Sequence, residues 1–109
     1  MVATCANNLG LVLQAQGDYV GARVQFERAL RISEVALGAE HPTVAIRLNN
    51  LGSVLRDLGD FAGARALFER ALRICYATLG DEHPRTQTVR QALESLLQQM
   101  PPGSDAGSY

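Results

Sequence analysis

Four leucines in the middle of the chain recur at three- and four-residue steps: Leu48, Leu51, Leu55 and Leu58. This spacing places them on one face of an α-helix and predicts a helix with a single apolar stripe. Gly59 follows directly, and a glycine ends a helix easily because it adopts the left-handed conformation without a Cβ clash. Asp60, the next residue, is a favourable N-cap for a second helix. The pattern therefore predicts a helical hairpin.

The second helix of this hairpin also has one apolar face, made of Ala64, Phe68, Ala71, Leu72 and Cys75. The whole hairpin occurs twice, because a shift of 42 residues aligns 2–42 with 44–84 and leaves 25 of the 41 positions identical. A fixed period of this length is the signature of a repeat protein. The two copies and the residues after them predict an all-α fold with five helices, at about 3–16, 18–37, 42–58, 60–79 and 84–99.

A third copy begins at Pro84 and stops after about half a repeat. Glu94 stands where the earlier copies have Gly10 and Gly52, and a second helix packed there would bury an unpaired carboxylate. We therefore interpret residues 85–99 as a capping helix with a polar outer face. Residues 100–109 lack an apolar period and are rich in turn-forming residues, which predicts a disordered tail. The expected organisation is one domain, 1–99, with repeats at 2–42 and 44–84, the capping helix and the tail.

The large and small positions of each copy resemble those of the tetratricopeptide repeat. They are Leu9, Gly10, Gly17, Tyr19, Ala22, Phe26 and Ala29, and then Leu51, Gly52, Gly59, Phe61, Ala64, Phe68 and Ala71. The 42-residue spacing, the Asn-Asn-Leu run and the Leu-Gly-x-Glu-His-Pro junction are similar to the long repeat of kinesin light chains and of many bacterial repeat proteins. The resemblance covers residues 2–99 and departs from the family pattern at Ala6, Glu34 and Tyr76. It implies a right-handed α-α superhelix, a solenoid of two full hairpins plus the C-terminal capping helix, with the first helices lining a concave groove.

Composition and charge exclude several classes of function. A net charge of −1 argues against a nucleic-acid partner or a membrane-surface anchor. No apolar run approaches the roughly 18 residues of a membrane span. The absence of lysine excludes a Schiff-base or Walker-type mechanism. The two cysteines stand at unrelated repeat positions and form no disulfide framework, which favours a reducing compartment, the cytoplasm.

The other reactive side chains also favour a structural interpretation. His41 and His83 recur with the junction between copies, and neither has a second ligand at metal-binding spacing. No nucleophile–base pair recurs in both copies, so we expect no enzyme activity, no cofactor and no metal.

The paired asparagines are the sharper signal, because asparagine is a poor helix former and two of them stand mid-helix in both copies. The family resemblance implies that the groove-facing positions bind an extended peptide, and these are Asn7, Leu11, Gln14, Asn49, Ser53, Arg56 and Gln91. An amide offers both a donor and an acceptor to a peptide backbone. The alternative for Asn8 and Asn50 is a tie between helices or to the preceding loop.

These observations predict a non-catalytic protein–protein interaction module, a scaffold or adaptor that binds a short extended peptide. We expect a micromolar dissociation constant, which corresponds to a binding free energy of about 8 kcal/mol. Two alternatives remain open. The chain could self-associate through its N-terminal helix, which has no preceding cap, or it could be a segment of a larger signalling or kinesin-light-chain-like protein.

Overall fold

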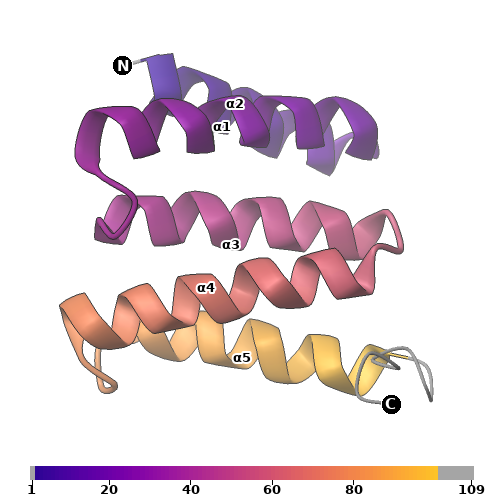
Figure 1. The fold of residues 1–109 in the computed structure, drawn as a ribbon. Coiled ribbons are helices and arrows are strands. Elements are labelled where there is room, and N and C mark those ends of the chain that lie inside the picture. The colour runs from indigo at the N-terminus through magenta and orange to yellow at the C-terminus, as the bar shows by residue number, and fades with distance from the viewer. Residues whose placement is uncertain (1, 101–109) are drawn as a thin grey trace.

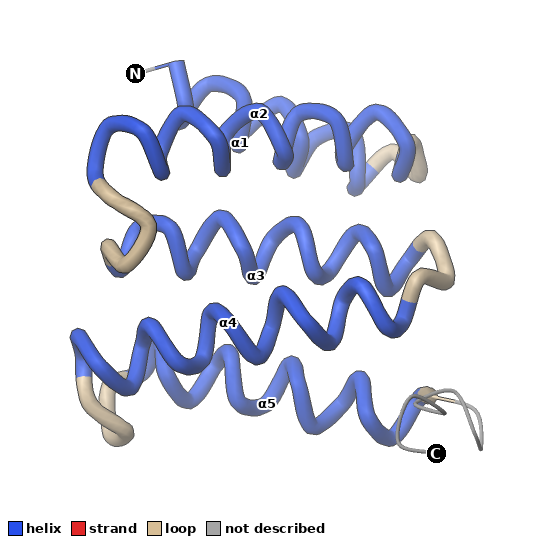
Figure 2. Tube along the Cα trace, in the orientation of Figure 1, coloured by secondary structure: helices blue, strands red, loops and turns tan. Residues whose placement is uncertain are grey.

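The computed structural model describes residues 2–100, in which all regular structure is helical (Figures 1 and 2). The helices are α1 (Val2–Ala15), α2 (Tyr19–Leu37), α3 (Pro42–Asp57), α4 (Phe61–Leu79) and α5 (Pro84–Gln99). Each predicted helix is present, and no predicted end differs from the observed one by more than one residue. The prediction of an all-α solenoid is confirmed.

The turn inside each hairpin follows from a glycine and an aspartate. Gly17 and Gly59 have φ values of 85° and 86°, in the left-handed region that a Cβ disfavours. After α3, the Gly59 amide donates to the Arg56 carbonyl at 2.9 Å and the Asp60 amide to the Leu55 carbonyl at 2.8 Å. This pair of bonds is a Schellman motif, which satisfies the last carbonyls of the helix. The helix end predicted from Gly59 therefore has the expected geometry.

The junctions between copies are closed by histidine N-caps. His41 Nδ1 accepts from the Thr43 amide at 3.0 Å, and His83 Nδ1 accepts from the Arg85 amide at 3.1 Å. A proline follows each histidine as the first residue of the helix, where its missing N–H is not needed. Both histidines therefore hold the start of a helix, which is the structural role expected of them.

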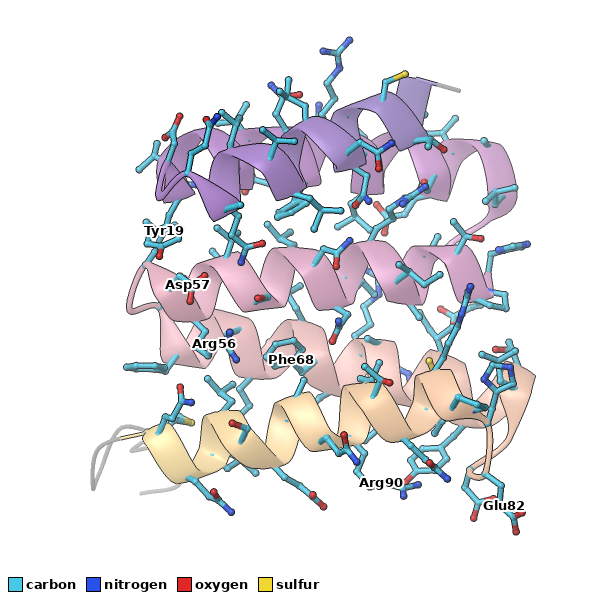
Figure 3. All side chains as sticks on the ribbon, turned by 180° about the vertical axis from the view of Figure 1, so that it is seen from behind. Tyr19, Arg56, Asp57, Phe68, Glu82 and Arg90 are labelled. Carbon is cyan, nitrogen blue, oxygen red and sulfur yellow. The ribbon has the colours of Figure 1, made fainter. Side chains whose placement is uncertain are left out.

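The helices form two layers. Helices α1, α3 and α5 lie in one layer and α2 and α4 in the other, as the opposite views of Figures 1 and 3 show. The first helices of the two copies and the half-copy therefore lie side by side on one surface of the molecule. We call this surface the α1–α3–α5 face.

Each hairpin is held together by an aromatic ring against a glycine. A Cβ placed on Gly10 would lie 2.6 Å from Phe26 Cε1, and one on Gly52 would lie 2.8 Å from Phe68 Cε1. Both phenylalanines are fully buried. The two helices of a hairpin therefore approach closely because the glycine has no side chain, and the ring fills the space beside it.

The last helix departs from this pattern. Leu96 of α5 is fully buried against Ala64 and Phe68, while Glu94 points outward and is exposed. Arg90 takes the place of the buried Leu48 and donates from Nε and Nη2 to the Tyr76 hydroxyl, at 3.1 and 2.9 Å. Its guanidinium also lies 5.5 Å from the centre of the Tyr76 ring. The charged residues of α5 are thus exposed or paired.

The first residue of the predicted tail, Met100, directly follows the last helix. Met100 caps α5, packs beside Leu96 and donates its amide to the Leu96 carbonyl at 3.0 Å. Residues 101–109, on which most of the tail prediction rests, lie outside the described residues.

We predict that Gly52→Ala lowers the free energy of unfolding by about 1–3 kcal/mol, because the new Cβ overlaps the buried Phe68 ring. Urea denaturation followed by circular dichroism measures the change. Phe68→Leu supplies the control, because its smaller side chain makes room for the new Cβ. The double variant should therefore lose less free energy of unfolding than the sum of the two single losses. A stability gain in Gly52→Ala, as in an unobstructed helix, would contradict the packing argument.

Candidate functional site

One end of the α1–α3–α5 face carries a hydrogen-bonded polar cluster. Gln14 of α1 donates through Nε2 to Ser53 Oγ at 3.1 Å and to Asp57 Oδ2 at 2.9 Å. Arg56 Nη2 donates to Ser53 Oγ at 3.4 Å, and Arg56 Nε lies 3.8 Å from Asp57 Oδ1. Three predicted site residues, Gln14, Ser53 and Arg56, are therefore brought together across two repeats. Figure 3 shows Arg56 and Asp57 on this end of the face.

The asparagine pairs form a bond between repeats. Asn50 Nδ2 of α3 donates to Asn7 Oδ1 of α1 at 2.8 Å. Asn7 is only 7% exposed, so its side chain is largely used by this contact. The structure thus gives Asn50 the helix-to-helix tie that was the alternative interpretation of the sequence.

Asn49 has a different environment, although it is the counterpart of Asn7 in the second copy. Its Oδ1 atom is buried and has no hydrogen-bond partner among residues 2–100. The reason is visible in the repeat, because the counterpart of Asn50 in the third copy is Ala92, which carries no amide donor. A buried carbonyl oxygen without a partner is unfavourable by about 1–3 kcal/mol, so a donor from outside would be stabilised there.

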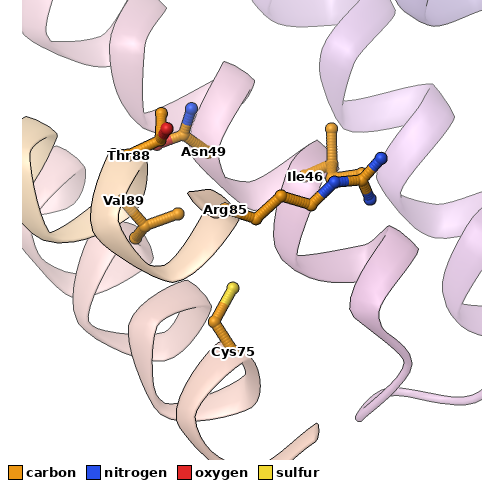
Figure 4. Close-up of a pocket in the computed structure, with 6 residues that line it drawn as sticks. All are labelled: Ile46, Asn49, Cys75, Arg85, Thr88 and Val89. Carbon is orange, nitrogen blue, oxygen red and sulfur yellow. The ribbon is translucent and has the colours of Figure 1, made fainter. Parts of the chain in front are cut away.

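Asn49 is also one of the residues that line an open hollow between α3 and α5 (Figure 4). The hollow has a volume of about 210 Å³ and is lined by Ile46, Asn49, Cys75, Arg85, Thr88 and Val89. It combines the side-chain amide of Asn49, a cation on Arg85 and an apolar wall of Ile46 and Val89. These groups suit a chain that carries N–H donors, a carboxylate and an aliphatic side chain.

The thiol at the hollow is a poor nucleophile. Burial raises the pKa of the Cys75 thiol, and the hydrogen bond with Thr86 and the charge of Arg85 oppose that rise only in part. Since the thiolate is the reactive form, Cys75 is expected to react slowly, and its side chain contributes to the packing of the core. The residues lining the hollow therefore suit binding better than nucleophilic attack.

The remaining predicted residues border the face. Leu11 of α1 is 43% exposed, and Gln91 of α5 is exposed. Of the residues that line the hollow, Cys75, Arg85 and Val89 were not predicted to face the groove. The family pattern places Ile46 and Thr88 in the groove-facing set, and Arg85 lies one helical turn before Thr88, on the same face of α5.

Two negative findings apply to residues 2–100. No group of three or more histidine, cysteine, aspartate or glutamate side chains is placed to hold a metal ion in this part of the chain. Likewise, none of its helices combines the length and the hydropathy that crossing a membrane requires.

Comparison with protein families agrees with the geometry of the repeat. The tetratricopeptide repeat model matches residues 2–77 and, in a second match, residues 48–100. The chain belongs to the tetratricopeptide repeat family. Tetratricopeptide repeats generally mediate protein–protein interactions. A search of the curated proteins finds no match.

We predict that Asn50→Ala lowers the free energy of unfolding by about 1–3 kcal/mol, because it leaves the buried Asn7 oxygen without a donor. Thermal or urea denaturation provides the measurement. Asn8→Ala is the matched control at the same repeat position, and its exposed side chain predicts a change within about 0.5 kcal/mol. Equal losses in the two variants would contradict the tie between repeats.

We also predict that iodoacetamide at pH 8 alkylates Cys5 well before Cys75, since Cys5 is exposed while Cys75 is buried and its thiol pKa is raised. Mass spectrometry of timed samples distinguishes the two sites, and Cys5→Ser isolates the slow reaction. In urea both thiols should react at similar rates. Equal rates in the folded protein would show that the Cys75 thiol is accessible.

Proposed function

We propose that this tetratricopeptide repeat protein binds a short extended peptide along the α1–α3–α5 face. The observation that carries the proposal is Asn49, whose buried oxygen has no hydrogen-bond partner among residues 2–100 and whose side chain lines an open hollow. In the other copy the equivalent oxygen accepts a hydrogen bond from Asn50, so Asn49 is the position where this face has an acceptor without a partner among residues 2–100. A backbone N–H of a peptide would satisfy it whatever the peptide's side chains are.

The charges around the face favour a peptide with an acidic residue. Arg85 lines the hollow, and Arg56 lies further along α3 in the polar cluster with Asp57. A guanidinium binds a carboxylate through two parallel hydrogen bonds, which gives orientation as well as affinity. Because Asp57 already lies near Arg56, we expect Arg85 to contribute more than Arg56.

The other predicted positions complete the proposed surface. Leu11 would contact an apolar side chain, and Gln91 would extend the polar lining on α5. Ser53 accepts a hydrogen bond from Arg56 and another from Gln14, so it links the two side chains. Asn7 takes part through the bond that aligns α1 with α3. The surface is short, so we expect a micromolar dissociation constant, equivalent to about 8 kcal/mol.

We also propose that the repeats are of the 42-residue, kinesin-light-chain-like type, acting as an adaptor without catalytic activity or cofactor in the cytoplasm. The support is the 42-residue identity between copies, the Asn-Asn-Leu run and the recurring histidine caps.

The test selects ligands from a random-peptide display library and measures their affinity by isothermal titration calorimetry. We predict that Asn49→Ala weakens binding by about tenfold, the equivalent of one hydrogen bond of about 1.4 kcal/mol, and that Arg56→Ala weakens it less. Arg73→Ala removes an exposed arginine of α4 and is the matched control. Circular dichroism checks that helicity is unchanged.

Unchanged affinity in both the Asn49 and Arg56 variants would place the binding surface elsewhere. A loss in Arg73→Ala as large as in Asn49→Ala would have the same meaning, because α4 lies in the other layer of the molecule.

A second candidate function uses the exposed side of α1, where Leu9 and Val12 are 46% and 51% exposed. Through it the chain would self-associate or would form part of a longer helical array. Light scattering separates self-association from the other cases, because a mass near 12 kDa at about 100 µM would exclude a stable dimer of this 11.8 kDa chain.

A further inference from the structure

The two junctions between copies differ at a pair of positions that face each other. At the first junction, where α3 packs on the first hairpin, Arg47 of α3 donates through Nε to Ser33 Oγ of α2 at 3.4 Å. At the second junction, where α5 packs on the second hairpin, the counterparts of these residues are Val89 and Cys75. Both of them line the hollow between α3 and α5 (Figure 4). The shorter side chains therefore leave open a space that corresponds to the side chain of Arg47.

The side chain of Arg47 is partly withdrawn from water. Its partner Ser33 is only 2% exposed, and burial lowers the pKa of the Arg47 guanidinium. An arginine in this situation lays its three methylene groups along the protein surface that it covers. The first junction thus shows what the second one lacks, which is a long side chain with an aliphatic stem.

The hollow at the second junction has the size and the lining for one aliphatic side chain. Its volume of about 210 Å³ exceeds that of an enclosed apolar cavity of about 150 Å³ that holds a benzene ring. Ile46, Val89 and Cys75 supply apolar surface, and the last two are almost fully buried. A side chain of leucine or methionine size therefore fits the hollow and would bury apolar surface in it.

The charge on the hollow excludes a copy of Arg47 itself as the occupant. Arg85 lines the hollow and is exposed, and it forms no ion pair within residues 2–100. Its counterpart at the first junction is the uncharged Thr43. A lysine or arginine side chain that entered the hollow would be repelled by Arg85, whereas a carboxylate beside the entering side chain would be attracted to it.

We therefore propose that the hollow is a specificity pocket, which admits one leucine or methionine side chain of the bound peptide and excludes lysine and arginine. The ligand supplies to the second junction the aliphatic stem that Arg47 supplies to the first. Asn49 and Arg85, which line the same hollow, bind the backbone of that residue and a carboxylate next to it. This inference rests on the proposed peptide binding and adds which residue of the peptide is recognised.

The probe for this pocket is N-acetyl-L-leucine, a small molecule that combines an aliphatic side chain, an N–H group and a carboxylate. It is titrated into the ¹⁵N-labelled full chain, and the backbone amide signals are followed by NMR. We predict a dissociation constant in the roughly millimolar range, with shifts at Ile46, Asn49, Thr88 and Val89. N-acetyl-L-alanine and N-acetyl-L-arginine should each bind at least about tenfold more weakly, the first for lack of apolar surface and the second because of its charge.

Two variants test the size and the charge of the pocket. Val89→Arg places in the hollow the residue that the first junction has, and it should weaken N-acetyl-L-leucine by at least about tenfold. Val20→Arg, at a position of α2 that is 57% exposed, is the matched control and should leave the affinity unchanged. Arg85→Gln changes an exposed residue and so preserves the fold. It should weaken N-acetyl-L-leucine by about threefold and reduce the preference over N-acetyl-L-arginine.

Three results would overturn the pocket. The first is equal affinity for the leucine, alanine and arginine derivatives, and the second is a set of shifts that omits the residues lining the hollow. The third is a folded Val89→Arg variant that binds N-acetyl-L-leucine as the original chain does. Should Val89→Arg fail to fold, the three probes and Arg85→Gln decide. Library peptides that lose affinity in Asn49→Ala but need no aliphatic residue would overturn the pocket alone and leave the proposed peptide binding in place.

Discussion

The contact between a buried phenylalanine and a glycine is the constraint on which the rest of the structure depends. Gly10 and Gly52 have no room for a methyl group because Phe26 and Phe68 lie against them. This close approach sets the spacing of the two helices in each hairpin, and the hairpin spacing sets which residues of successive copies meet. The third copy has Glu94 at the glycine position, and there the side chain is exposed and no second helix follows among the described residues.

Between hairpins, polar contacts carry the specificity that apolar packing alone lacks. Leucine, valine and phenylalanine side chains tolerate small shifts, whereas the Asn50–Asn7 bond and the Arg70–Glu34 pair require one alignment. Both contacts cross from one copy to the next. They therefore show, at two separate places, which groups one hairpin presents to the next. Among residues 2–100 the Asn49 oxygen lacks such a neighbour, and Asn49 is the residue for which peptide binding is proposed.

The sequence predicted the helices well, because periodic leucines, helix-ending glycines and histidine–proline junctions are local signals that act within a few residues. The site was only partly predictable. Asn7 and Asn49 are identical residues at equivalent positions, yet one oxygen is paired and the other is not. The difference arises 43 residues further along the chain, where Asn7 has Asn50 as its partner and Asn49 has Ala92 at the equivalent position. Such a difference depends on which residues meet in space, so helix periodicity could not show it, although comparison of the third copy with the second contains the clue.

The side chains at the two ends of the described structure differ in their environment. At the C-terminal side, Arg90 replaces a core leucine and is bound by Tyr76, Glu94 is exposed and Met100 covers the last turn. At the N-terminal side, the chain carries Asn8, Leu9, Val12 and Arg28, which are identical to Asn50, Leu51, Val54 and Arg70 of the second copy. In the second copy these residues are buried or paired against the first hairpin, whereas in the first copy they lie on the surface of the part of the chain that the structure describes. The same four residues therefore have two environments, and the difference between them is the hairpin that packs beside the second copy.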